Sequence, residues 1–246
     1  MKVILTENQI NNLILLEEFN NYLNSQIISE GFNYKSLRKI IKRMLLSGMT
    51  IAAILTAING VIESNERKME VLRIAEEEMQ AIKKQQELEK QSDSIKNAKI
   101  QACADYMSKV LGYKGYKLTD TKLTPEALVE TSEKYSFDLP LLLAAAHLES
   151  CFGVTKRAKK TNSVYSVGAY DNGKDVVVYS HPNESIEGYI RLLQQDYLIN
   201  GKTINDLLKT NGFVNKNGYR YASDNKYEQH LNSIRNKIIQ NYPELK

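Results

Sequence analysis

The segment that most constrains the fold is LPLLLAAAHLES, which runs from Leu139 to Ser150. It is apolar at almost every position, and Pro140 near its start and Gly153 beyond its end are typical of helix boundaries. We therefore expect an apolar helix here. Glu149 is the exception in this segment, because a carboxylate in such a helix must be held neutral, paired with a partner or used in chemistry.

Glu149 is a candidate general acid. Two small residues, Ala145 and Ala146, precede it by one helical turn and allow a second helix or a substrate to approach. A carboxyl at the end of an apolar helix is partly desolvated, which raises its pKa, and a general acid needs a proton to donate near neutral pH. The alternative is a glutamate that simply reaches solvent. His147 lies on another side of the helix, so we expect it to pack rather than act as a base.

The region around this helix predicts a mainly α domain over residues 119–246. Thr124, Pro125 and Glu126 are typical of a helix start, and apolar residues recur at helical spacing in 183–198 and 226–242. Between these helices, VYSVGAYDNGKDVVVYS places Asp-Asn-Gly between two runs rich in valine and tyrosine. This pattern predicts a β-hairpin.

The N-terminal part predicts a helical extension. Residues 44–62 carry no charge, and five basic residues precede them within 35–43. A helix of 19 residues would rise about 28 Å, close to the thickness of a bilayer. Segment 44–62 is therefore interpreted either as a membrane contact or as a docking helix buried against another helix or subunit. A cleaved signal peptide fits less well, because 43 residues precede the run.

Residues 63–118 predict a charged helical linker. No proline or glycine occurs from 63 to 108, and a narrow apolar stripe from Met69 to Ile82 is typical of a coiled-coil seam. Self-association or partners in a virus particle are therefore expected through 63–104, with 83–94 as a solvated helix. The glycine-punctuated stretch 112–120 marks the boundary before the compact domain. The predicted segments are therefore 1–62, 63–118 and 119–246.

Charge and cysteine content exclude several classes. The chain has 33 Lys and Arg against 29 Asp and Glu, spread evenly, so we predict no nucleic-acid partner. Cys103 and Cys151 lack metal-like spacing, and the sequence has no phosphate-binding loop, dinucleotide fingerprint or zinc-protease motif. We predict no metal and no cofactor, and expect two buried thiols rather than a disulfide.

Two motifs carry a family resemblance. Residues 149–153 read Glu-Ser-Cys-Phe-Gly, and residues 162–166 read Asn-Ser-Val-Tyr-Ser. They resemble the Glu-Ser-Gly-Trp-Gly and Asn-Asn-Leu-Phe-Gly elements of the glucosaminidases that cleave bacterial peptidoglycan (glycoside hydrolase family 73). VVYSHPNESIEGYIRLL and YRYASDNKYEQHLNSIRNKI are similar to later elements of that family, in the same order. The resemblance covers Leu123 to Gln240. It departs from the family at Cys151, Phe152, Ser163 and Ser166.

The resemblance implies a fold and a reaction. The fold is a lysozyme-like helical domain with a small β-hairpin lobe, and the two flank a groove for a glycan strand. Glu149 is implied as the general acid at the β-1,4 bond after N-acetylglucosamine. The partner carboxylate is implied to be Asp171 or Asp175. Neither is needed if the substrate's own acetamido group assists, or if a transglycosylase outcome leaves an anhydro-sugar.

Four further residues are candidates for substrate binding. Tyr165, Tyr170 and Tyr221 lie on motif elements, and aromatic faces stack on sugar rings. Asn162 belongs to the same set, although bracing the loop behind the acid is the simpler role for it. For Tyr227, on an apolar helix face, core packing is the better interpretation.

These features predict a peptidoglycan hydrolase of the cell envelope or of a phage particle, with an N-terminal region that anchors it. The phage placement follows from the order of the segments alone. Two other hypotheses stay open. One is a structural or assembly protein whose lysozyme-like domain only binds glycan, and the other is a membrane-anchored bacterial enzyme that remodels the cell wall.

Overall fold

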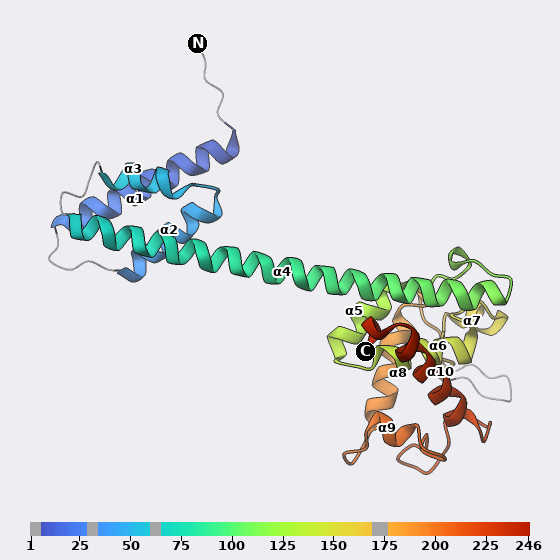
Figure 1. Ribbon diagram of the computed structural model, residues 1–246. Coiled ribbons are helices and arrows are strands. Elements are labelled where there is room, and N and C mark those ends of the chain that lie inside the picture. The colour runs from blue at the N-terminus through green and yellow to red at the C-terminus, as the bar shows by residue number, and fades with distance from the viewer. Residues whose placement is uncertain (1–5, 29–33, 60–64, 169–176) are drawn as a thin grey trace. The chain divides into compact units, whose positions relative to one another are not determined.

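The computed structural model describes residues 6–28, 34–59, 65–168 and 177–246 (Figure 1). The chain divides into two compact units, Met1–Ser92 and Asp93–Lys246. In the described ranges the regular elements are helices, so the prediction of a mainly α protein is confirmed. Each unit has its own hydrophobic core.

The first unit packs three helices against the beginning of a fourth. These are α1 (Glu7–Ile28), α2 (Tyr34–Leu46), α3 (Ile51–Asn59) and α4 (Asn65–Tyr113). One face of α2 is buried and contains Leu37, Ile41 and Met44, while its basic residues are exposed. Two surface ion pairs link helices of this unit, Arg38–Glu77 at 2.6 Å and Arg43–Glu18 at 2.8 Å. The burial of one apolar face accounts for the helical spacing of the apolar residues.

The uncharged segment 44–62 is not one continuous helix. α2 ends at Leu46, the Ser47 hydroxyl donates to the Met44 carbonyl at 2.7 Å, and Gly48 has φ +89°. The chain therefore turns before α3 begins, and the expectation of a 19-residue helix is wrong. Met44 and Ile54 are buried in the core of the first unit. None of the helices in the described ranges has the length and apolar character needed to span a membrane.

α4 takes part in both units. Every residue from 83 to 95 is exposed, as expected for a solvated helix over 83–94. Its last turns bury one face in the core of the second unit, through Ala102, Cys103, Met107 and Leu111. This burial explains why the second compact unit begins at Asp93, upstream of the glycine-punctuated stretch. The division at 62 and 118 stays a prediction.

The second unit is built around α6. After α4 come α5 (Pro125–Tyr135), α6 (Leu139–Ser150), α7 (Lys156–Thr161), α8 (Glu184–Leu192), α9 (Ile204–Leu207) and α10 (Tyr227–Asn241). Residues 139–146 are all buried, and α6 packs mainly against α10. The Asp138 carboxylate accepts the Leu141 N–H at 2.7 Å and the Arg235 guanidinium at 3.0 Å. One side chain therefore caps α6 and ties it to α10.

The predicted β-hairpin lies largely outside the described residues, since its turn falls within 169–176. On either side of this gap, 164–168 and 177–180 form turns and coil rather than strands. Within the described ranges, the β-type pairing is limited to an isolated bridge between Val214 and Arg220. No β-lobe is seen there. The residues flanking the gap nevertheless touch, because a Cβ added to Gly168 would lie 2.7 Å from a Val177 methyl group.

We expect Gly212→Ala to destabilise the second unit by about 2 kcal/mol. An added Cβ would lie 2.3 Å from the backbone oxygens of Asp206 and Leu207, which cannot move without disrupting α9. The matched control is Gly112→Ala, in the last turn of α4, where a Cβ meets nothing within 4 Å. That variant should be neutral or slightly more stable. Urea unfolding of both variants checks the prediction, and equal stabilities would contradict it.

Candidate active site

The position of Glu149 is set by a tight turn directly after it. α6 ends with a Phe152 N–H donating to the Ala146 carbonyl at 2.9 Å, and Cys151, Phe152 and Gly153 all have positive φ. Left-handed backbone costs a non-glycine residue about 1 kcal/mol. Burial of Phe152 holds the turn, as does the Ser150 hydroxyl, which donates to the Val164 carbonyl at 2.6 Å. The turn fixes Glu149 in the last turn of α6.

The Glu149 side chain lines a cavity of about 170 Å³. α7 and the segment that follows it supply most of the remaining wall, through Thr155, Arg157, Ala158, Thr161, Ser163, Ser166, Val167 and Val177. Glu149 is the one carboxylate among the described residues of this lining. The Ser163 hydroxyl is buried and has no hydrogen-bond partner within the described structure, so a water or a ligand can bind it.

Burial determines the protonation of Glu149. Removal of the carboxyl from water raises its pKa above the ordinary value of 4.5, and this effect outweighs the Tyr227 and Ser166 hydroxyls, which lower it. Although the Tyr227 hydroxyl acts on Glu149, it has no partner that meets hydrogen-bond geometry in the described structure. The contact is therefore weaker than a formed hydrogen bond. Glu149 therefore keeps its proton to higher pH than an ordinary glutamate does, and its side chain lines the cavity.

Tyrosines surround the buried side of Glu149. Tyr189, Tyr221 and Tyr227 are close enough for the Glu149 charge to raise the pKa of each phenol, beyond the larger effect of burial. Their rings pack edge to face or tilted, with centroids 5.6 Å apart for Tyr221 and Tyr227 and 5.9 Å for Tyr189 and Tyr221. This apolar surrounding is what desolvates the acid.

A buried ion pair anchors two of these tyrosines. Glu228 is 1% exposed and accepts two bonds from the Arg220 guanidinium, at 2.8 and 3.1 Å. Its carboxylate also accepts the Phe213 N–H at 3.2 Å. Arg220 directly precedes Tyr221 and Glu228 directly follows Tyr227. The pair therefore fixes both tyrosines, from two separate segments, against the acid.

The structure brings some predicted site residues to this place as supports. Tyr165 is 0% exposed and stacks on Tyr189 with centroids 4.6 Å apart, which favours a packing role over contact with substrate. The Tyr221 hydroxyl donates to the Tyr165 carbonyl. The Asn162 amide donates to the carbonyls of Tyr179 and Ser180, at 2.9 and 3.2 Å, so Asn162 braces the loop.

The remaining candidate residues are not among those that the structure places at the cavity. Tyr170, Asp171 and Asp175 are outside the described residues, so their positions relative to Glu149 stay a prediction. His147 faces away from the acid, where its Nδ1 is 2.7 Å from the Tyr106 hydroxyl. Cys103 is buried and Cys151 is half-buried, and both are free thiols.

The sequence does not identify three residues near Glu149. Tyr189 packs beside the acid, and Thr155 and Ser166 line the cavity. Tyr189 shares the apolar face of α8, so its spacing indicates only a core position. For Tyr227 the same spacing predicts core packing, although its hydroxyl also lowers the pKa of Glu149. The motif around Ser166 could have identified part of the cavity lining, because polar residues in a loop that follows a candidate acid can line its cavity.

The family model named Glucosaminidase, described as mannosyl-glycoprotein endo-beta-N-acetylglucosaminidase, matches residues 125–240. The matched range contains Glu149, every residue of the cavity lining and the buried Arg220–Glu228 pair. No curated protein matches the sequence.

Proposed function

We propose, from the premise that residues 125–240 are a glucosaminidase-family glycoside hydrolase domain, that this protein cleaves the β-1,4 bond after N-acetylglucosamine in peptidoglycan. The observation that carries the proposal is the placement of the Glu149 carboxyl in the wall of a cavity, where burial raises its pKa. A peptidoglycan substrate places the reaction in the cell envelope. Placement in a phage particle stays a prediction that rests on segment order.

In the proposed reaction Glu149 is the proton donor. Departure of the leaving sugar requires a proton on the glycosidic oxygen, and a carboxyl whose pKa is raised by burial keeps its proton to higher pH and can supply it. The surrounding tyrosines keep Glu149 desolvated, and the turn at 151–153 holds it at the cavity. The buried Ser163 hydroxyl offers a hydrogen bond to the substrate or to a water.

The second carboxylate is proposed to come from segment 169–176, as Asp171 or Asp175. Glycosidases that use two carboxyl groups place them about 5–10 Å apart. The residue that follows the segment, Val177, lines the cavity beside Glu149, which supports this source. If neither Asp171→Asn nor Asp175→Asn lowers activity, assistance by the substrate acetamido group or an anhydro-sugar outcome becomes the better mechanism.

The test is incubation of the full chain with purified peptidoglycan, followed by mass spectrometry of the products. New reducing ends on N-acetylglucosamine support the proposal. Anhydro ends would identify a transglycosylase, and reducing ends on N-acetylmuramic acid would identify a different bond. Binding without any new end would favour the alternative of a domain that only binds glycan.

We expect Tyr227→Phe to move the alkaline limb of kcat/KM to higher pH. The Tyr227 hydroxyl lowers the pKa of Glu149, so its removal should leave the acid protonated over a wider range. Tyr165→Phe is the matched control, because this buried phenol is not among the groups that shift the pKa of Glu149. The pH profile on soluble glycan fragments checks this. A limb at the wild-type position, or an equal shift in both variants, would contradict it.

A further inference from the structure

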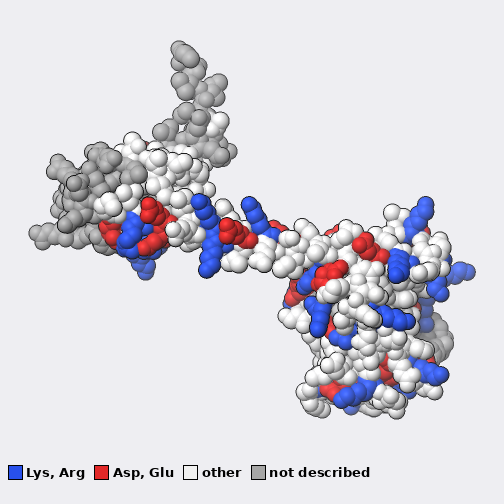
Figure 2. Space-filling view, viewed as in Figure 1, with Lys and Arg blue, Asp and Glu red and all other residues white. Residues whose placement is uncertain are grey.

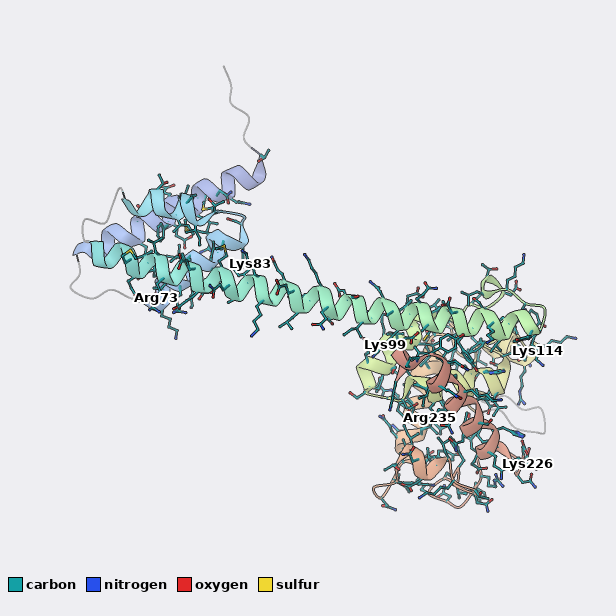
Figure 3. All side chains as sticks on the ribbon, in the orientation of Figure 1. Arg73, Lys83, Lys99, Lys114, Lys226 and Arg235 are labelled. Carbon is teal, nitrogen blue, oxygen red and sulfur yellow. The ribbon has the colours of Figure 1, made fainter. Side chains whose placement is uncertain are left out.

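A surface with unbalanced positive charge lies next to the candidate active site. It consists of Lys114 and Lys117, which follow the end of α4, and Lys156 and Lys159 of α7, and is called the basic rim below. All four side chains are exposed. Figure 2 shows blue side chains gathered over the C-terminal end of α4, and Figure 3 labels Lys114 there, beside α7.

The two segments of the basic rim form one surface. The Lys159 ammonium lies 6.0 Å from the centre of the Tyr116 ring, across the boundary between the segments. The Thr121 hydroxyl donates to the Phe152 carbonyl, which ties the end of the first segment to the turn after Glu149. Lys114 is close enough to lower the pKa of His147, although burial is the larger cause.

The charge of the basic rim is not neutralised within the described structure. Its four lysines form no ion pair with any described carboxylate, whereas Lys96 and Lys134 of the same unit are paired at 2.8 and 3.1 Å. The nearest acidic residue in sequence, Asp120, accepts the Lys117 backbone N–H at 2.7 Å. Arg157 and Lys160 also lie on α7 but have interactions of their own and do not belong to the basic rim.

The basic rim adjoins the cavity at α7, which carries residues of both. Thr155 and Ala158 line the cavity, and Lys156 and Lys159 follow each of them directly in the chain. A glycan strand that extends from Glu149 along α7 would therefore bring its substituents near Lys156 and Lys159, and the contact between Lys159 and Tyr116 continues this surface to Lys114 and Lys117. In peptidoglycan, the sugar that leaves after cleavage at N-acetylglucosamine is N-acetylmuramic acid, which carries a short peptide with free carboxylates.

We infer that the basic rim binds the carboxylates of these peptides and thereby favours peptide-bearing glycan over bare glycan. The inference rests on the proposed function, because it takes its ligand from the same substrate. Each exposed lysine contributes little alone, but four neighbouring ones add up to roughly a tenfold gain in affinity. The gain should decrease as salt increases, since exposed charges are screened.

The test measures binding without cleavage, in the full chain carrying Glu149→Gln. The rim variant adds Lys114→Gln, Lys117→Gln, Lys156→Gln and Lys159→Gln. The matched control instead adds glutamine at four exposed lysines elsewhere, namely Lys83, Lys84, Lys90 and Lys237. Co-sedimentation with insoluble cell walls then gives Kd for three preparations. These are intact walls, walls whose carboxylates are blocked with a neutral amine, and walls stripped of phosphate polymers by hydrofluoric acid.

The rim variant should bind intact walls about 10-fold more weakly than the parent, while the control variant binds as the parent does. Blocking the carboxylates should remove the difference between parent and rim variant, and stripping the phosphate polymers should leave it unchanged. Equal binding by the rim variant and the parent would overturn the inference. The inference would also be overturned if the difference in Kd between parent and rim variant disappeared only on walls stripped of phosphate polymers. That result would identify a phosphate polymer as the ligand. Rim-dependent binding without hydrolysis by the wild-type chain would contradict the proposed function alone.

Discussion

Glu149→Gln is expected to lower kcat on purified peptidoglycan by about 10³-fold, the contribution typical of a positioned general acid. Glutamine keeps the size and most of the packing of the side chain but cannot donate a proton to a leaving oxygen. The measurement is the rate at which new ends appear, by mass spectrometry, for wild type and variant under the same conditions. A variant with more than a tenth of wild-type activity would remove Glu149 from the role of acid.

The same substitution should make the protein more stable at neutral pH, which separates lost chemistry from lost folding. Burial raises the pKa of Glu149 in the folded state above its ordinary value of 4.5. The contribution of protonated Glu149 to stability is therefore fully present below pH 4.5 and is lost as pH rises through the pKa of the folded state. Glutamine is neutral at every pH, so the variant does not lose this stability as pH rises. We expect a Tm a few degrees above wild type at pH 7 and no difference near pH 4. A lower Tm at pH 7 would mean that Glu149 is held as a charged group.

Arg220→Met is expected to destabilise the second unit by about 3–5 kcal/mol, the usual cost of leaving a buried charge without its partner. Glu228 is 1% exposed, and in the variant it would keep the Phe213 N–H as a partner but lose the guanidinium. Because the pair fixes Tyr221 and Tyr227 beside Glu149, activity should fall as well, even below the unfolding temperature. Urea unfolding and the same assay of new ends measure the two effects.

Two further variants test whether the burial of Glu228 causes the loss of stability expected for Arg220→Met. Arg220→Met combined with Glu228→Gln should regain a large part of the lost stability, because no buried charge is left unpaired. Lys209→Met breaks an ion pair of similar length, 2.7 Å to Asp206, but on an exposed side chain, and should change stability little. If Arg220→Met and Lys209→Met behave alike, the Arg220–Glu228 pair does not hold the site together.

The helices of the second unit could be read from the sequence because their signals are local. Asp138 and Pro140 begin α6, and the apolar run up to Ala146 is buried as expected for the central helix. The motif that resembles the family places a carboxyl at its end, with Cys151 where the family motif has glycine. The structure shows that Cys151 accepts a left-handed backbone, in a turn held by the burial of Phe152.

Segment 44–62 shows where local signals are insufficient. Its length and lack of charge match a membrane helix, yet a serine and a glycine at 47 and 48 introduce a turn, and the first unit buries Met44 and Ile54. The start of the second compact unit at Asp93 is similar. It depends on which face of α4 meets α5 to α10, and the α4 sequence alone does not specify a partner.

The sequence by itself determined the helical class, the limits of α6 and the identity of the candidate acid, because caps, apolar spacing and a short motif act over a few residues. Only the tertiary structure decided what surrounds that acid. Tyr189 and Tyr227 come from helices distant in sequence, and the Arg220–Glu228 pair joins two segments around them. The pKa of a carboxyl depends on its solvation and on the charges near it in space, which local spacing does not record.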